Sequence, residues 1–308
     1  MKFNHVFKQY LNCSDRAEVF QYLQDNLTES LYFWDYFVNW DKVFNKFRDV
    51  EINLNLLNYL VGKDNIEEEF RVLLREYPKV ASIIPILLAC RDKDFKILHS
   101  YTSGNLKYKV FNFKTKNQLT EQEITDILEF TKKTKIIELF KNKLIKNIPD
   151  YVLGIEVGLD SNGRKNRSGR TMETIVESLL LQIQQQKSIL LISQATSEKI
   201  RTQWGISVKV DKSSRRFDFA VKNDDTLYLI ETNYYGGRGS KLKATAGEYR
   251  TLFNFISSQG HKFIWITDGI GWKTTLRPLE ETFSHIDYIL NLKMVSTGLL
   301  SEIISQKL

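Results

Sequence analysis

Asp218 and Glu231 are carboxylates whose positions in the chain suit the binding of a divalent metal ion. Each lies in a segment in which apolar and polar residues alternate, 215–221 for Asp218 and 226–233 for Glu231. Alternation of this kind is typical of β-strands. Residues 222–225, which separate the two segments, have the composition of a turn, so we expect the two strands to pair as a hairpin.

This hairpin is expected to bring both carboxylates to one face. Pairing of Val221 with Thr226 across the turn would set its register. Asp218 would then lie opposite Leu229 and one diagonal step from Glu231, at roughly 7–8 Å between backbones. Carboxylate oxygens at that spacing can share one hard cation, and Mg²⁺ is the expected cofactor. The alternative is a solvated hairpin face that carries two ordinary carboxylates.

A third carboxylate, Glu173, is a candidate further ligand of the same metal ion. Residues 171–186 carry apolar side chains at three- and four-residue spacing, which predicts an amphipathic helix. Glu173 and Glu177 lie one turn apart at the rim of its apolar stripe. Plain helix-surface charge is the expected role of at least one of the two.

Basic residues gather in two segments that suit a nucleic acid. In 162–170, arginines and a lysine alternate with small polar residues, which predicts a loop that contacts phosphates and base edges in a groove. The second segment follows the glycines of 236–239 and opens a helix over 240–257, whose first amides would also suit a phosphate. The glycines match neither the G-x-x-x-x-G-K-[ST] nor the G-x-G-x-x-G spacing of nucleotide-binding loops. The candidate DNA contacts are Asn162, Arg164, Lys165, Asn166, Arg167, Arg170, Arg238, Lys241 and Lys243. A solvated basic loop is the alternative for the first segment.

The composition is that of a folded protein with a polyanionic partner. The 308 residues suffice for one large domain or two of ordinary size, and 42% of them are hydrophobic and 26% charged, so disorder is not expected. The formal net charge of +7 suits nucleic acid. No apolar run approaches the roughly 20 residues that cross a bilayer, and the first residues lack the apolar core of a signal peptide. We therefore expect a cytoplasmic protein with no membrane partner.

The cysteines and histidines argue against other metal sites. Cys13 and Cys90 lie in apolar helical contexts, where free thiols are expected rather than a disulfide. The 4 histidines are widely scattered, and no Cys/His spacing suits zinc.

Residues 1–150 are expected to form a mainly α-helical accessory region, and 151–308 to form the domain that carries the site. The first region includes a hairpin over 95–113 and a capping box, Thr120 with Glu123, that opens a helix. Its aromatic cluster over 32–40 is interpreted as a helical core seam, with base stacking as the alternative.

From residue 171 the predicted order is helix, three strands, helix and strand. The strands are 200–210, the central hairpin and 261–267, and helices over 275–286 and 297–306 close the chain. This order implies an α/β (α+β) fold with a mixed sheet flanked by helices.

That order, with Asp218 and Glu231 on the second and third strands, resembles the PD-(D/E)xK nuclease core. Within this superfamily the chain resembles the type II restriction endonucleases of the DpnII/MboI kind. The resemblance rests on GLDSNGRKNRSG at 158–169, Glu173 after Met172, FDFAV around Asp218, and ETNYYGGRGSKLKATAGEY at 231–249.

The resemblance implies Mg²⁺-dependent cleavage of double-stranded DNA at GATC, before the G, when its adenine is unmethylated. It also implies a companion adenine methyltransferase, and the two-fold symmetry of GATC favours a homodimer. Asn233 occupies the lysine position of the superfamily pattern. An amide can hold a water or a phosphate but supplies no positive charge, and Lys241 or Lys243 is a candidate to replace it.

The rival interpretation is a non-catalytic DNA-binding regulator that keeps the fold with a degraded site. The missing lysine favours it, whereas Asp218, Glu231 and Glu173 favour an enzyme. A DNA methyltransferase would need a glycine-rich cofactor loop and an aromatic catalytic tetrapeptide, and neither is found.

Overall fold

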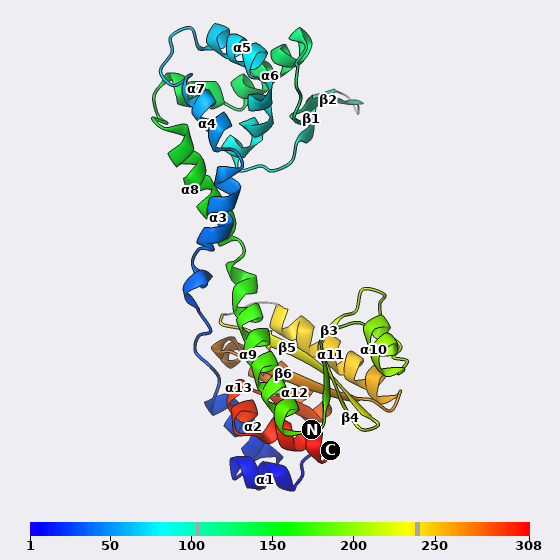
Figure 1. Ribbon diagram of the computed structural model, residues 1–308. Helices are drawn as coiled ribbons and strands as arrows, with labels where there is room; N and C mark the ends of the chain where they lie inside the picture. Colours follow the sequence, from blue (N-terminus) through cyan, green and yellow to red (C-terminus); the bar gives the residue numbers. More distant parts are fainter. Residues whose placement is uncertain (103–104, 238–240) are drawn as a thin grey trace. The chain divides into compact units, whose positions relative to one another are not determined.

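The computed structural model describes residues 1–102, 105–237 and 241–308, which fold into two compact units (Figure 1). The sheet unit consists of Met1–Phe33 and Lys165–Leu308, and the helical unit is Trp34–Arg164. Residue 150 therefore lies inside the helical unit, in the first turn of α8 (Ile148–Ser161). The first 33 residues belong with the sheet rather than with the predicted N-terminal region.

The sheet unit is built on one mixed sheet with the strand order β3-β4-β5-β6-β7. The first two pairings, β3 with β4 and β4 with β5, are antiparallel, and β5, β6 and β7 run parallel. This confirms the mixed sheet flanked by helices. The strands are β3 (Leu190–Ala195), β4 (Phe217–Asn223), β5 (Thr226–Tyr234), β6 (Lys262–Asp268) and β7 (Tyr288–Leu290). The helices are α1 (His5–Leu11), α2 (Arg16–Asp25), α9 (Arg164–Gln186), α10 (Ser197–Trp204), α11 (Lys241–Ser257), η3 (Ile270–Thr274), α12 (Leu276–His285), α13 (Leu292–Ser296) and α14 (Leu299–Ser305).

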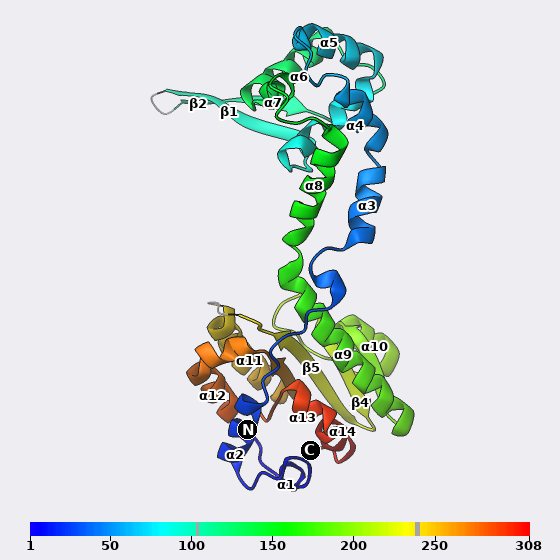
Figure 2. The same cartoon turned by 90° about the vertical axis from the view of Figure 1, so that its left-hand side faces the viewer.

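Helices α9 and α11 pack on opposite faces of this sheet (Figures 1 and 2). Ser193 of β3 donates its hydroxyl hydrogen bond to Glu177 of α9. The strand ladders relate Ser193 to Ile264 of β6 on that same face. Trp265, the next residue of β6, faces the other way and meets the ring of Tyr249 of α11 edge-on, with the ring centroids 5.1 Å apart. The core therefore lies in two layers, one on each side of the sheet.

Two expected elements of the sheet unit differ from the structure. The segment 200–210 is not a strand, because α10 occupies its first half: the Thr196 side chain caps the helix by accepting from the Lys199 amide, and Gly205 ends it with a φ of 70°. The first strand of the sheet is instead β3. The basic segment 162–170 is not a loop either, since α9 already begins at Arg164. Gly169 costs that helix only about 1 kcal/mol and does not break it.

The central hairpin forms, with a register two residues from the predicted one. Asn223 pairs with Thr226, so the turn has two residues rather than four. Asp224 adopts a φ of 49°, the left-handed backbone that a two-residue hairpin turn requires. A shift of two residues leaves every side chain on its expected face, whereas a shift of one would have reversed them all.

The helical unit contains a hairpin and a helical core of its own. The hairpin is confirmed as β1 (Asp94–Thr102) paired with β2 (Asn105–Asn112), and the capping box of Thr120 and Glu123 is confirmed at the start of α6. The helices are η1 (Trp34–Tyr36), α3 (Trp40–Arg48), α4 (Glu51–Asn58), α5 (Ile66–Glu76), η2 (Pro78–Leu88), α6 (Glu121–Lys133), α7 (Ile136–Lys141) and α8.

The aromatic cluster over 32–40 is not a core seam, because its side chains are largely exposed: Trp34 keeps 87% of its surface and Phe33 keeps 67%. Cys13 and Cys90 are both free thiols, as predicted. Within the described ranges, no helix combines the length and the apolar character that crossing a membrane would require.

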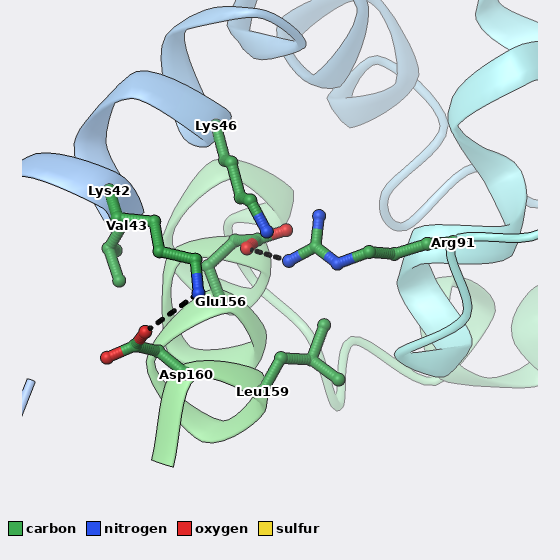
Figure 3. Close-up of a pocket in the computed structure, with 7 residues that line it drawn as sticks. All are labelled: Lys42, Val43, Lys46, Arg91, Glu156, Leu159 and Asp160. Atoms are coloured by element: carbon green, nitrogen blue, oxygen red, sulfur yellow. Dashed lines mark hydrogen bonds and ion pairs between the residues drawn. The ribbon is translucent and has the colours of Figure 1, made fainter. Parts of the chain in front are cut away.

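A cluster of charges joins α3 to α8 inside the helical unit, around a cavity of about 210 Å³ (Figure 3). Glu156 and Asp160 project from α8 and are almost fully buried. Arg91 forms an ion pair with Glu156, and Lys42 lies 3.5 Å from Asp160. The second oxygen of Glu156 has no hydrogen-bond partner among the described residues. Burial first, then the charges of Arg91 and Lys42, lower the pKa of Lys46, which also lines the cavity.

Arg91→Ala is expected to lower the free energy of unfolding by about 3–5 kcal/mol, because it leaves a buried carboxylate without its partner. Lys114→Ala is the matched control: it removes an ion pair with Asp94 in which both side chains are largely exposed, and should cost less than about 1 kcal/mol. Urea denaturation followed by circular dichroism measures both. Equal midpoints for the two variants would contradict the role of Arg91.

Candidate active site

The hydrogen-bond ladder between β4 and β5 opens at Asp218. The last paired residues before the opening are Phe219 and Ile230. Beyond them, the backbone amide of Thr232 donates to Oδ2 of Asp218 at 2.7 Å, and the Thr232 hydroxyl donates to the same oxygen at 2.8 Å. The carboxylate thus replaces the backbone carbonyl that a continued ladder would offer. The gap between the two strands therefore contains a carboxylate oxygen that is held in place and can act as a metal ligand.

Glu231 lies across this gap. Continuing the observed register places it directly opposite Asp218, not on the predicted diagonal. Its side chain is almost fully buried, and the Tyr249 hydroxyl donates to its Oε2 at 3.3 Å. Nη1 of Arg215 lies 3.8 Å from its Oε1, which accepts no hydrogen bond from the described residues.

Glu173 reaches the same site from α9. Nε2 of Gln194 donates to its Oε2 at 3.0 Å. Gln194 belongs to β3 and has a φ of 52°. This left-handed backbone conformation is uncommon for residues other than glycine. This local distortion allows a strand residue to bind a carboxylate on the α9 side. Glu177, one turn later, is bound by Ser193 instead.

The charge of Asp218 disfavours the ionised form of both glutamates. Burial, and then the charge of Asp218, raise the pKa of Glu231 to about 8. The same two causes, in the same order, raise the pKa of Glu173. Burial also raises the pKa of Asp218, although the hydrogen bonds from Thr232 act in the opposite direction. Each carboxylate would be more stable in its charged form if a cation lay among them.

These residues fit a hard divalent cation. The donor set consists of carboxylate oxygens, and Oε1 of Glu231 is a buried acceptor without a hydrogen-bond donor. In the described part of the chain, no three His, Cys, Asp or Glu side chains approach closely enough to form a complete ligand set. A metal ion held by Asp218 and Glu231 would therefore need water molecules or a phosphate oxygen as its other ligands.

Asn233, in the position of the superfamily lysine, is tied to the core. Its Oδ1 accepts a hydrogen bond of 2.8 Å from Nε1 of Trp265. The amide therefore supplies no charge, and its oxygen is occupied by a structural contact. Of its two candidate replacements, Lys241 is the first residue of α11, and Lys243 is exposed on the first turn of that helix.

The predicted DNA contacts among the described residues lie at the end of α8, at the start of α9 and at the start of α11. Asn162 is the C-cap of α8, and Nε of Arg164 donates to the carbonyl oxygen of Phe37 at 3.0 Å. Lys165, Asn166, Arg167 and Arg170 all belong to the first two turns of α9. Arg238 lies outside the described residues.

The sequence analysis assigned no function to four residues that lie at the site: Arg215, Arg216, Gln194 and Tyr249. Arg215 is buried, with hydrogen bonds of 2.7–2.8 Å to Asp211 and of 3.0 Å to Glu248. Only the adjacency of Arg215 and Arg216 to Asp218 could have drawn attention to these arginines. Gln194 and Tyr249 lie 24 residues before and 18 residues after the two main carboxylates, and only the folded chain brings them in.

The fold and the site define a class of protein. A helix with Glu173, three strands with Asp218 on the second and Glu231 on the third, a helix and a further strand together form a restriction-endonuclease-like core. The chain belongs to the DpnII restriction endonuclease family, whose model matches residues 19–302. It is thus an endonuclease.

Curated relatives cover nearly the whole chain. It is 48% identical over 292 residues to the type II restriction enzyme MjaIII of Methanocaldococcus jannaschii, covering 93% of this chain and 99% of that protein. It is 34% identical over 285 residues to the type II restriction enzyme DpnII of Streptococcus pneumoniae, covering 90% and 95%. It is 38% identical over 261 residues to the type II restriction enzyme MboI of Moraxella bovis, covering 84% and 86%. No solved structure matches the chain significantly.

The raised pKa of Glu231 predicts how the stability of the metal-free protein depends on pH. Its pKa in the folded protein is about 8, whereas the ordinary value is 4.5. Between pH 4.5 and pH 8, therefore, Glu231 keeps its proton in the folded protein but loses it in the unfolded chain. Stability must therefore fall as pH rises through this window, by about 1.4 kcal/mol for each unit of difference. Glu231→Gln should reduce the fall to the part that Asp218 and Glu173 contribute, which thermal melting between about pH 5 and pH 9 would measure.

Two controls accompany this measurement. Glu280→Gln, at an exposed position of α12, should melt like the wild type at every pH. Added Mg²⁺ should reduce the fall in the wild type, because binding the cation favours the ionised carboxylate. A Glu231→Gln variant whose melting temperature follows the wild type across the range would contradict the assignment.

Proposed function

We propose that this endonuclease cleaves double-stranded DNA at GATC, before the G, when the adenine is unmethylated, and that Mg²⁺ is its cofactor. The observation that supports the proposed chemistry is the opening of the β4–β5 ladder at Asp218, with Glu231 opposite it and with Glu173 of α9 near enough to feel its charge. The proposed DNA sequence is supported by the likeness of 158–169 and 231–249 to the DpnII/MboI enzymes. A companion adenine methyltransferase would protect host DNA in the cytoplasm.

Each residue of the site has a distinct task in the proposed hydrolysis. Asp218 and Glu231 would hold the metal ion, and Glu173 would complete the ligand set or bind through water. When bound, the metal supplies an acidified water and neutralises charge on the phosphate and on the departing 3′-oxygen. Thr232 fixes the carboxylate of Asp218 through two hydrogen bonds, and Tyr249 orients that of Glu231.

The basic face of α9 is proposed to contact the duplex. Its first two turns carry Arg167 and Arg170, which precede Glu173 on the same helix. An arginine that binds a guanine with two hydrogen bonds would contribute about 1–3 kcal/mol of discrimination. The other proposed contacts to phosphates or bases are Asn162, Arg164, Lys165, Asn166, Arg238, Lys241 and Lys243. Because GATC reads identically on both strands, we propose that two copies act as a homodimer.

Asp218→Asn is expected to reduce the cleavage rate by more than ~100-fold. Loss of a residue that only supports a metal ligand costs up to about 100-fold, and Asp218 is proposed as a ligand itself. An amide keeps the shape of the side chain but cannot offer the charge that holds the metal ion. Asp224→Asn is the matched control, since it changes an exposed carboxylate in the turn of the same hairpin. The measurement is digestion of plasmid DNA, methylated or unmethylated at GATC adenines, with Mg²⁺ or with EDTA.

The expected result is that wild-type protein and Asp224→Asn give fragments with 5′-GATC ends from unmethylated plasmid in Mg²⁺ alone. Asp218→Asn should still bind a GATC duplex in Ca²⁺. Cleavage of both plasmids would refute the sensitivity to methylation, and cleavage by Asp218→Asn at the wild-type rate would refute the metal site.

A further inference from the structure

The described part of the site contains three carboxylates and lacks the lysine that the superfamily places on β5. Asn233 occupies that position, and its oxygen accepts from Trp265. A phosphodiester brought to this site adds a further negative charge, which grows on the phosphate oxygens during hydrolysis. A cation from elsewhere in the chain would stabilise this charge.

Two neighbouring arginines lie at the start of β4, and only one is committed to structure. Arg215 is buried and forms hydrogen bonds with Asp211 and Glu248. Arg216 is exposed, and among the described residues it makes no hydrogen bond or ion pair. It precedes Asp218 by two residues, about 7 Å of extended chain. Its guanidinium group is therefore free to bind a ligand beside the metal site.

The surface around Arg216 is suited to an anion. Arg216 lines a cavity of about 420 Å³ together with Thr196, Lys212, Ser213, Ser214 and Arg215. These lining residues offer cations and hydroxyl groups but no carboxylate. Lys212 is paired with Glu248 at 3.0 Å, so Arg216 contributes the uncompensated charge of the cavity. A DNA phosphate matches this chemistry.

The charge of Arg216 is also felt by the carboxylates. Burial raises the pKa of Asp218 and of Glu173, and Arg216 acts against burial at both groups. Among the described residues, Arg216 is the one arginine that has this effect on both of them. Arg216 thus lines the cavity and also lies near enough to both carboxylates to affect their charge, so a phosphate in the cavity would lie beside Asp218.

We propose that Arg216 binds a non-bridging oxygen of the scissile phosphate and supplies the positive charge that position 233 lacks. The inference rests on the proposed function. In the reaction, the water oxygen bonds to phosphorus, the bond from phosphorus to the 3′-oxygen breaks, and the proton lost by water is balanced by the proton gained at that oxygen. Arg216 stays protonated throughout, because a guanidinium does not release its proton in proteins. It is a fixed charge and not a proton donor.

The test compares Arg216→Ala, Arg216→Lys and Lys222→Ala. Lys222 is the matched control, since it lies on β4, the strand that begins directly after Arg216, and is six residues or about 20 Å of extended chain away. Single-turnover cleavage of a short GATC duplex in Mg²⁺ gives the chemical rate. Duplex affinity in Ca²⁺ and the Mg²⁺ concentration that protects against thermal melting give two readouts that do not depend on activity.

Arg216→Ala is expected to slow the chemical step by about 10²–10³-fold, the usual effect of removing one donor to a developing oxyanion. Its duplex affinity and Mg²⁺ protection should stay within about tenfold of the wild type, because the carboxylates remain in place. Added guanidinium ion should restore part of the rate, and equal concentrations of NaCl should not. Arg216→Lys should retain more activity than Arg216→Ala.

Three outcomes would overturn the inference. If the Arg216→Ala variant cleaves as fast as Lys222→Ala, the positive charge of Arg216 does not contribute to the chemical step. Arg216→Ala that loses Mg²⁺ protection and rate together, without rescue by guanidinium, would show that Arg216 only supports the carboxylates. Wild-type protein that binds the GATC duplex without cutting it would overturn the proposed function as well, so the two failures are distinguishable.

Discussion

The repulsion among buried carboxylates at the opening of the β4–β5 ladder is the constraint on which the rest of the site depends. Asp218 can occupy this position because Thr232 offers it two donors, a hydroxyl group and a backbone amide that would otherwise lose its ladder partner. Glu231 is tolerated opposite it because Tyr249 and Arg215 approach its two oxygens. These contacts offset only part of the cost, since the pKa of Glu231 remains near 8. The fold therefore disfavours the ionised form of these carboxylates unless a cation lies beside them.

The surrounding framework keeps this arrangement from relaxing. Arg215 is itself held by Asp211 and by Glu248 of α11, so it cannot swing toward Glu231 to form a closer pair. Tyr249, on the same helix, packs against Trp265, whose indole nitrogen also holds Asn233. One aromatic contact thus positions both the carboxylate and the amide of β5. Arg215 is thus kept from pairing more closely with Glu231.

Much of this could be predicted from the sequence, because alternation along a strand depends only on parity. The faces of Asp218 and Glu231 were predicted correctly although the register was wrong by two residues, since a two-residue slip conserves parity. The turn length could not be predicted, because it depends on the left-handed backbone of Asp224, and aspartate adopts either conformation. The mixed sheet followed from the order of helices and strands.

The failures have physical causes as well. The segment 200–210 has the composition of a strand, yet a cap at Thr196 and a stop at Gly205 make its first half helical. Residues 162–170 look like a loop because glycine and small polar residues are frequent there, but nothing in them breaks a helix that continues to Gln186. The aromatic cluster over 32–40 has helical spacing, and spacing does not reveal whether any other element covers it.

The continuity of α9 gives the site a mechanical property. Arg170 and Glu173 are separated by less than one turn, about 4.5 Å along the axis, with no joint between them. A helix of this length is stiff, so in the proposed complex a displacement that the duplex imposes on Arg170 would also move the carboxylate of Glu173. A misplacement of 1 Å at a reacting centre can cost about 10²-fold in rate. Under the proposed function, a wrong DNA sequence would then lower the rate of bond breaking as well as the affinity for the duplex.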